Sequence, residues 1–317
     1  MDLQKAFDTV SHHQLLLTLV NRFGCSPHVV SMIKSFLQNR QQRVRIPSCD
    51  TPFNDISSGV PQGSILGPLL FILFLDDIPN FNETKCVMYA DDISLIHKFE
   101  DIKNCKLQPI VDSLSDWVCK KRLAINVCKT KVMFLSRKSC NASYPDIFIN
   151  GVPIEVVTSV KILGVIFSNN LRWSEQFSSL YAKCCRAMSY VKKLKSNGNC
   201  NDVIMQAFFG IVFCHIVYCW PIMCDLNRKD FKKLEILYKT ACRWANLTHH
   251  NSLRDLLDRC CVKIIKSICI HKDCHPLSQF FVLRDSKHDI RHSRALLPLR
   301  RNSSLYYNSF VRFSSRS

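Results

Sequence analysis

The sequence predicts an α+β fold over about the first 170 residues, followed by an α-helical basic region. Three observations lead to this prediction. Apolar residues recur at three- and four-residue spacing over residues 11–43, which is typical of amphipathic helices. Two β-branched and aromatic runs, CVMYA and ISLIH, flank the acids Asp91 and Asp92 and predict a hairpin with the carboxylates at its turn. After Asn170 the spacing is helical almost throughout, with long basic faces.

The elements can be placed in chain order. Residues 11–43 predict two helices, broken at Gly24 and restarted at Pro27, that lead into a strand at 43–46. The string SSGVPQGSILGP predicts a glycine-punctuated loop, and the apolar run LLFILFL after Pro68 predicts a short helix that ends at Asp76 and Asp77. The remaining predictions are a helix over 101–122, strands over 123–138 and 160–169, and helices beyond 170.

Composition favours a folded protein with a polyanionic partner. The 317 residues are 47% hydrophobic and 21% charged, with a formal net charge of +18. The charge is uneven: residues 1–140 hold 17 Lys/Arg and 13 Asp/Glu, whereas residues 141–317 hold 26 and 12. A basic second half indicates nucleic acid as the first candidate partner, with a solvated basic surface as the alternative.

Cysteine usage and hydropathy bear on the cellular compartment. The 18 cysteines show no repeating frame and the start of the chain is polar, so we expect reduced thiols in an intracellular protein of the cytoplasm and nucleus that is not secreted. Residues 203–224 contain no Asp, Glu, Lys or Arg, and this uncharged run is about as long as a helix that spans a bilayer. Because Gln206, Gly210, His215 and Pro221 interrupt the run, we expect buried helices and no membrane partner.

The adjacent carboxylates of Asp91 and Asp92 need a reason to lie together, since like charges repel. Asp2 supplies a third acid from a separate predicted strand that runs into a helix. Three such carboxylates can bind two divalent cations about 4 Å apart, which removes the repulsion. The alternative is an exposed acidic turn. We interpret Asp8 as a helix N-terminal acid rather than a metal ligand, and Asp76 and Asp77 as a structural helix end.

Five strings in order carry a family resemblance: DLQKAFDTV, SSGVPQGSILGPLLF, YADDISL, LAINVCKTKVMFL and VKILGVIF. Together they resemble motifs A to E of reverse transcriptases, and in particular those of non-LTR (LINE-type) retrotransposons of the jockey-like group. The resemblance implies a palm, an antiparallel sheet with helices on one face, followed by an α-helical thumb and a C-terminal helical region. It implies RNA-directed DNA synthesis with RNA template, DNA primer or target, and dNTPs as partners.

The resemblance also implies roles for individual residues. Asp2, Asp91 and Asp92, with the Leu3 carbonyl, would bind two Mg²⁺ ions, for which Mn²⁺ could substitute. Phe7 would be the steric gate against a 2′-hydroxyl, with a core aromatic as the alternative. Lys129 would protonate the leaving pyrophosphate, with a solvated strand-edge lysine as the alternative. The remaining matches are nucleotide contacts at Pro61, Gln62, Gly63 and Tyr89, and the primer grip at Leu163 and Gly164.

The resemblance predicts that the chain has four parts. The parts are a partial palm over 1–138, a primer grip and connection over 139–175, a thumb-like basic region over 176–250, and a C-terminal basic region over 251–317.

The chain begins at motif A, so we expect the family's fingers and endonuclease to lie outside it and the 317 residues by themselves to give no primer extension. An inactive transposon remnant, or a nucleic-acid-binding protein that uses only the basic helices, is the alternative. The Cys/His run of residues 260–275 lacks a clean metal-binding spacing, so zinc is disfavoured.

Overall fold

A computed structural model describes residues 1–46, 49–81, 84–99, 105–135, 144–223, 226–247, 251–270, 282–283 and 296–297. The chain divides into two compact units, Met1–Val160 and Lys161–Ser317. The first unit mixes helices with two-stranded sheets, and the second consists mainly of helices. An α+β fold is therefore confirmed, whereas the four-part division stays a prediction.

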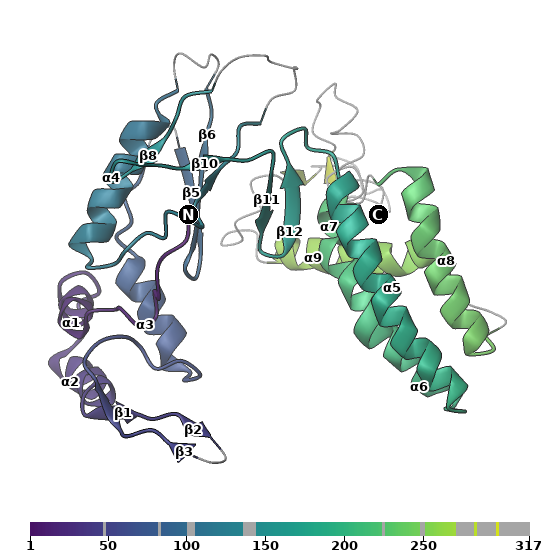
Figure 1. Cartoon of the computed structure of the whole chain (residues 1–317), viewed down its shortest axis with the longest axis horizontal. Helices are drawn as coiled ribbons and strands as arrows, with labels where there is room; N and C mark the ends of the chain where they lie inside the picture. Colours follow the sequence, from purple (N-terminus) through teal and green to yellow (C-terminus); the bar gives the residue numbers. More distant parts are fainter. Residues whose placement is uncertain are drawn as a thin grey trace. The chain divides into compact units, whose positions relative to one another are not determined.

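The first unit opens with the predicted helix pair, which Figure 1 shows in purple. Helix α1 (His12–Asn21) and helix α2 (Pro27–Leu37) each follow a serine whose side chain accepts a backbone N–H of the first turn, as N-caps do. Pro27 fits the first position of α2 because its missing N–H would have had no helical partner there. Two small antiparallel pairs follow: β1 (Arg40–Gln42) with β4 (Asn54–Ile56), and β2 (Arg45–Ile46) with β3 (Cys49–Asp50).

Helix α3 (Leu66–Leu75) begins three residues earlier than the sequence predicted. The Ser64 hydroxyl explains the early start, because it accepts the Gly67 N–H at 2.9 Å and donates to the Pro61 carbonyl at 2.7 Å. Pro68 is tolerated because it lies in the first turn of the helix. The helix ends at Asp76, as predicted, and its buried residues include Phe71 and Phe74.

The hairpin of β5 (Thr84–Tyr89) and β6 (Asp92–His97) is confirmed, with Ala90 and Asp91 at its turn. Its side chains alternate between two faces, as strands require. Met88, Ile93 and Leu95 pack into a core with α1, α3 and helix α4 (Leu107–Lys120), while the opposite face is exposed. One face of the hairpin is therefore covered by helices.

The prediction of a long strand over 123–138 was wrong. The described part of this segment holds the two-residue strand β7 (Lys131–Val132), which pairs in parallel with β10 (Glu155–Val156). Before it, Asn126 and Thr130 close a turn through a Thr130 Oγ1 to Asn126 carbonyl bond of 2.8 Å. Asn, Ser and Thr favour such local bonds over a ladder. The pair β8 (Phe148–Ile149) and β9 (Val152–Pro153) completes the unit.

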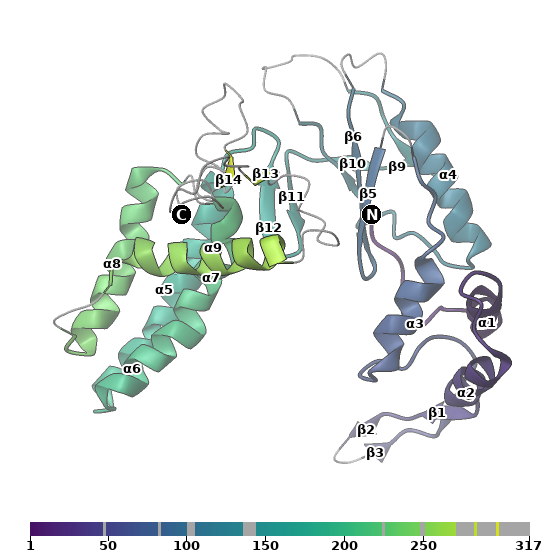
Figure 2. The ribbon, with the colours of Figure 1, turned by 180° about the vertical axis from the view of Figure 1, so that it is seen from behind.

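The second unit begins with the hairpin of β11 (Ser159–Ile162) and β12 (Val165–Ser168), which starts at the boundary. Its helices are α5 (Ser174–Ser196), α6 (Asn201–Ala207), the π-helical turn η2 (Phe208–Phe213), α7 (Cys214–Met223), α8 (Arg228–Trp244) and α9 (Leu253–Ile270). Figure 2 shows α9 lying across α7. The short pair β13 (Val282–Leu283) and β14 (Leu296–Leu297) follows.

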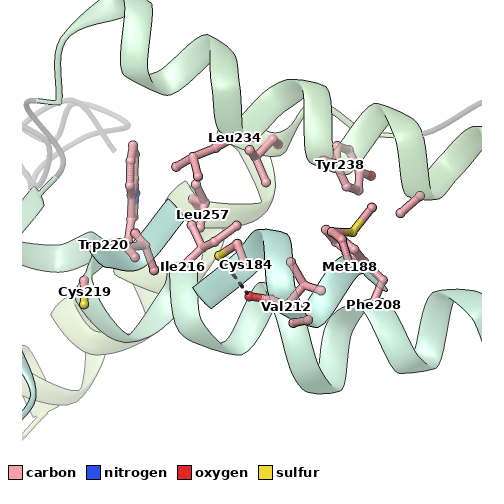
Figure 3. Close-up of a cluster of buried hydrophobic side chains, with 14 of the residues drawn as sticks. Cys184, Met188, Phe208, Val212, Ile216, Cys219, Trp220, Leu234, Tyr238 and Leu257 are labelled. Carbon is pink, nitrogen blue, oxygen red and sulfur yellow. Dashed lines mark hydrogen bonds between the residues drawn. The ribbon is translucent and has the colours of Figure 1, made fainter. Parts of the chain in front are cut away.

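The core of the helical unit is formed by side chains from all of its long helices. Figure 3 shows Phe208 and Val212 of η2 and Ile216 of α7 facing Leu234 of α8 and Leu257 of α9. The Cys184 thiol points at the Val212 carbonyl within this core, and burial raises the pKa of that thiol to about 12. Such a thiol stays protonated and unreactive at neutral pH.

Residues Asn201–Met223 form a continuous helix that is long and apolar enough to cross a membrane by length and composition. One of its faces supplies core residues at three- and four-residue spacing, from Ile204 to Met223. A core helix of a folded domain has this arrangement. The lysines that the sequence places on basic faces, including Lys192, Lys193 and Lys232, are exposed.

The neighbouring acids at the end of α3 differ in what they stabilise. Asp77 pairs with the Lys121 ammonium at 2.8 Å and accepts the Trp117 indole N–H at 3.2 Å, and the Lys121 side chain is only 10% exposed. Asp76 pairs with Arg22 at 2.6 Å, but both side chains are 47% exposed. Both acids are therefore structural, as expected, yet only Asp77 neutralises a buried cation.

We expect Asp77→Ala to lower the free energy of unfolding by about 2 kcal/mol, because it leaves a buried ammonium and a buried indole N–H without their acceptor. The matched variant Asp76→Ala should lose less than about 1 kcal/mol, since exposed ion pairs contribute little. Urea denaturation of the two variants measures the difference. Equal losses would contradict the assignment.

Candidate active site

The site is built around an extended segment, residues 1–3, that lies between two other stretches of backbone. On one side Asp2 pairs with Asp92 in an antiparallel bridge, and the Ile93 N–H donates to the Met1 carbonyl at 3.0 Å. On the other side Leu3 pairs with Ile125, flanked by bonds from the Asn126 N–H to the Asp2 carbonyl and from the Gln4 N–H to the Ala124 carbonyl, both 2.8 Å. Residues 1–3 are thus the middle of a three-stretch sheet.

This pairing places Asp2 and Asp92 on the same face. Residues directly opposite each other in an antiparallel pair project to the same side. Their neighbours Leu3 and Ile93 are 3% and 1% exposed and point into the core. The two acids therefore project from the open face of the hairpin, where Tyr89 is paired opposite Asp92 and is also exposed.

Asp91 lies in the two-residue turn of the hairpin. The turn needs a left-handed residue at its first central position, and Ala90 adopts φ 53° there. A residue with a Cβ pays about 1 kcal/mol for this conformation. The strained turn keeps Asp91 next to Asp92 at the end of the hairpin closest to Asp2.

The backbones of Asp2 and Asp92 are paired, but the carboxylates do not converge on one point. In the part of the chain that the structure describes, no group of three His, Cys, Asp or Glu side chains is arranged to hold a metal ion. The Asp2 carboxylate instead faces the Lys129 ammonium, with 3.3 Å between Oδ2 and Nζ. Neighbouring carboxylates repel one another, and the positive charge of the Lys129 ammonium offsets that repulsion. The donor set itself, carboxylate oxygens on an open face, suits a hard divalent cation.

Lys129 reaches Asp2 from a turn rather than from a strand edge. Asn126 organises this turn, because its side-chain oxygen accepts the Lys129 N–H at 3.3 Å and its own N–H is bonded to Asp2. The buried Thr130 closes the turn from the other end. The sequence interpretation missed Asn126, although an Asn three residues before a polar position is a recognisable turn signal.

The loop of residues 57–63 is docked onto the segment that follows Asp2. The Val60 N–H donates to the Phe7 carbonyl and the Gly59 N–H to the Val10 carbonyl, each at 2.8 Å. A His12 Nε2–H donates to the Gly59 carbonyl at 2.7 Å. Phe7 is held between these contacts, half-buried, and its ring stacks on Phe71 at 4.3 Å. Phe7 thus packs in part against the core, as the alternative reading anticipated.

The interpretation of Asp8 as a helix N-terminal acid was wrong. Residues 4–8 form a turn, with Lys5 at φ 44°, and α1 begins only at His12. The docked loop explains the difference, because it takes the carbonyls of Phe7 and Val10 for its own hydrogen bonds. The Asp8 carboxylate accepts the Gln62 side-chain amide at 2.9 Å instead. Gln62 and Gly63 are exposed at the tip of the loop, and Pro61 is half-buried.

The predicted primer-grip residues lie in the second unit, at the tip of the β11–β12 hairpin. Leu163 and Gly164 are its two turn residues, with φ 47° and 84°, the left-handed pair that tight hairpins use. The Tyr218 hydroxyl of α7 donates to the Leu163 carbonyl at 2.6 Å. The Gln176 side chain of α5 accepts the Ile166 N–H at 2.8 Å. The hairpin is therefore fastened to the helices by two side chains that the sequence did not single out.

The cysteine and histidine run of residues 260–275 is described only in part. Cys260 and Cys261 lie in α9, and Cys261 belongs to the core of the helical unit. Residues 271–275 lie outside the described residues. The expectation on zinc stays a prediction.

Comparison with known families identifies the class of protein that this arrangement defines. Residues 1–167 match the model of the reverse transcriptase (RNA-dependent DNA polymerase) family, which is more than half of the chain. The chain belongs to the reverse transcriptase family, and its first unit fits a palm-type fold.

The chain is similar to several proteins of Drosophila mobile elements. The chain is 34% identical over 192 residues to "RNA-directed DNA polymerase from mobile element jockey" of Drosophila funebris, and the alignment covers 57% of this chain and 20% of that protein. It is 24% identical over 273 residues to "Probable RNA-directed DNA polymerase from transposon X-element" of Drosophila melanogaster, and that alignment covers 80% of this chain and 29% of the relative. A third relative, from transposon BS, is 28% identical over 262 residues, with 77% and 28% covered. The chain thus spans less than a third of each of these proteins.

We expect Gly59→Ala to lower the free energy of unfolding by about 3 kcal/mol. A Cβ at Gly59 would lie 2.8 Å from the Asp8 Cα and carbonyl oxygen, and φ is 91°. Gly24→Ala is the matched control, because Gly24 has φ 59° but nothing within 4 Å, so it should lose only about 1 kcal/mol. Thermal unfolding of both variants separates the steric contact from the backbone strain, and similar losses would rule out tight docking.

Proposed function

We propose that this chain carries the polymerase centre of a non-LTR retrotransposon reverse transcriptase, which extends a DNA primer on an RNA template. The carrying observation is the direct pairing of Asp2 with Asp92 on an open face, with Lys129 against Asp2. The names of the jockey, X-element and BS relatives support the same activity.

In this proposal Asp2, Asp91 and Asp92 hold two Mg²⁺ ions through their carboxylate oxygens. When bound, such ions activate a 3′-hydroxyl and stabilise the leaving pyrophosphate. The Leu3 carbonyl is a further oxygen donor. Successive carbonyls of an extended segment point to opposite edges, and that of Asp2 points to Asn126. The Leu3 carbonyl is thus directed toward the hairpin edge, where Asp91 and Asp92 lie.

Other residues orient the substrate and move a proton. Lys129 carries a proton within reach of the acids and donates it to the leaving group. Phe7, held by the Val60 N–H and by Phe71, lies against the sugar of the incoming nucleotide. Its fixed position excludes a 2′-hydroxyl, so the product is DNA. Pro61, Gln62, Gly63 and Tyr89 line the approach of the nucleotide.

The helical unit supplies the contacts to RNA and primer. Its exposed lysines on α5 and α8 offer phosphate contacts that are independent of sequence, and the Leu163–Gly164 turn grips the primer end. In this division of labour α5 to α8 act as a thumb. The second candidate, a nucleic-acid-binding protein without polymerase activity, rests on the same basic helices and does not need the three acids.

Asp92→Asn should reduce Mg²⁺-dependent primer extension by at least about 100-fold. Loss of a residue that only supports a metal ligand already lowers metal affinity or activity about 10- to 100-fold, and Asp92 is proposed to bind the metal directly. The assay uses poly(rA)/oligo(dT) and the longest protein that the gene encodes around these 317 residues. Asp76→Asn, from the look-alike acid pair at the end of α3, is the control and should keep full activity.

Binding of the same primer–template is measured in parallel. Extension that survives Asp92→Asn would refute the polymerase assignment. Tight binding without any extension in the unmodified protein would favour the second candidate.

Lys129→Met should raise the affinity of the 317-residue chain for Mn²⁺ about two- to fivefold, because a neighbouring ammonium no longer competes for the Asp2 carboxylate. Titration followed by electron paramagnetic resonance measures the free ion. Lys131→Met is the control, since the Lys131 ammonium pairs with Glu155 and not with the acids. Equal affinities in the two variants would contradict the role of Lys129 beside Asp2.

A further inference from the structure

Asp8 and Gln62 join the two loops that border the candidate active site. The Gln62 Nε2 lies 2.9 Å from the Asp8 Oδ1, and both residues are exposed at the surface of the site. They are 54 positions apart in the sequence, so the contact depends entirely on the docking of the loop of residues 57–63. The hydrogen bond to Gln62 therefore gives Asp8 a role other than metal ligand or helix cap.

The chemistry of the two side chains fixes the orientation of the amide. An ionised carboxylate has no proton and can only accept hydrogen bonds, whereas a Gln amide has one donating and one accepting end. The end that faces Asp8 must therefore be the NH₂ group. The Gln62 Oε1 is then directed away from Asp8 at the loop tip.

The backbone around the pair is fixed from both sides. The Ser58 hydroxyl donates to the Asp8 carbonyl at 3.0 Å, and the Gly59 backbone lies so close to Asp8 that a Cβ would not fit. The Val60 N–H holds Phe7, the residue just before Asp8. A rigid carboxylate is thus presented to a side chain that would otherwise rotate freely in solvent, and holding such a side chain lowers the entropy lost on ligand binding.

We propose that Asp8 is a positioning residue that fixes the Gln62 amide with its oxygen facing the incoming nucleotide. The inference rests on the proposed function, because it assigns Gln62 to the nucleotide side of a polymerase site. Asp8 itself does not touch substrate. It acts by selecting one of the two amide orientations and by tying Gln62 to the segment that carries Phe7.

Steady-state primer extension with the longest encoded protein tests the consequence. Asp8→Ala should raise the KM for dNTP about tenfold while kcat changes little, because the amide must now be ordered at the expense of binding. Asp8→Asn should recover most of the affinity, since its side-chain oxygen can still accept the Gln62 NH₂. Asp55→Ala is the matched control. Asp55 accepts the Gln41 amide at 2.8 Å on the β1–β4 pair, outside the site, so its loss should leave KM unchanged.

A second measurement uses the 317-residue chain itself and needs no activity. The side-chain amide signal of Gln62 in a ¹⁵N–¹H spectrum should collapse toward its free position in Asp8→Ala and stay shifted in Asp8→Asn. A Gln62 signal that Asp8→Ala leaves in place overturns the inference, as does an unchanged KM in an active enzyme. If the longest encoded protein gives no extension while the 317-residue chain shows the shifted signal, the proposed polymerase is refuted and the Asp8–Gln62 orientation stays supported.

Discussion

The candidate active site depends on one short stretch of main chain, residues 1–3, being paired along both of its edges. Pairing with β6 puts Asp2 opposite Asp92, and pairing with residues 124–126 brings the turn that carries Lys129. Since side chains alternate along extended backbone, burial of Leu3 and Ile93 determines that the two acids face outward together. A slip of one residue in either ladder would bury the acids and expose the core, so the register of the site is specified by the core itself.

The second constraint is steric. Gly59 meets Asp8 backbone to backbone, and this close approach fixes the loop of residues 57–63 against the segment that carries Phe7. The same contact makes Asp8 available to Gln62. The core beneath is apolar, with Phe71 under Phe7 and Phe74 beneath the ammonium of Lys121. Charge is kept at its edges, where Asp77 neutralises Lys121 and Asp2 faces Lys129. The open face therefore carries the Asp2 and Asp92 carboxylates beside the Lys129 ammonium.

The helical unit holds its own hairpin by different means. Its turn has two successive left-handed residues, Leu163 and Gly164. The backbone strain at Leu163 is offset by a hydrogen bond from the Tyr218 hydroxyl to the Leu163 carbonyl. Gln176 is buried between the Ile166 N–H and the Cys219 thiol, so the hairpin and the helices α5 and α7 share hydrogen bonds as well as core. The hairpin is therefore bonded to the helical unit through the side chains of Gln176 and Tyr218.

The sequence by itself determined the elements whose signals are local. Capped helices at Ser11 and Ser26, the β5–β6 hairpin and the end of α3 follow from periodicity and turn residues, and the order of five motifs identified the family. Tertiary structure decided what depends on distant partners. Residues 126–130 form a turn because Asn126 bonds locally and to Asp2, and residues 4–8 form a turn outside α1, where the loop of residues 57–63 bonds to the Phe7 and Asp8 carbonyls. Asp8 has the residue type of a helix cap, but docking of the loop of residues 57–63 made its carboxylate the acceptor for Gln62, which lies 54 positions further along the chain.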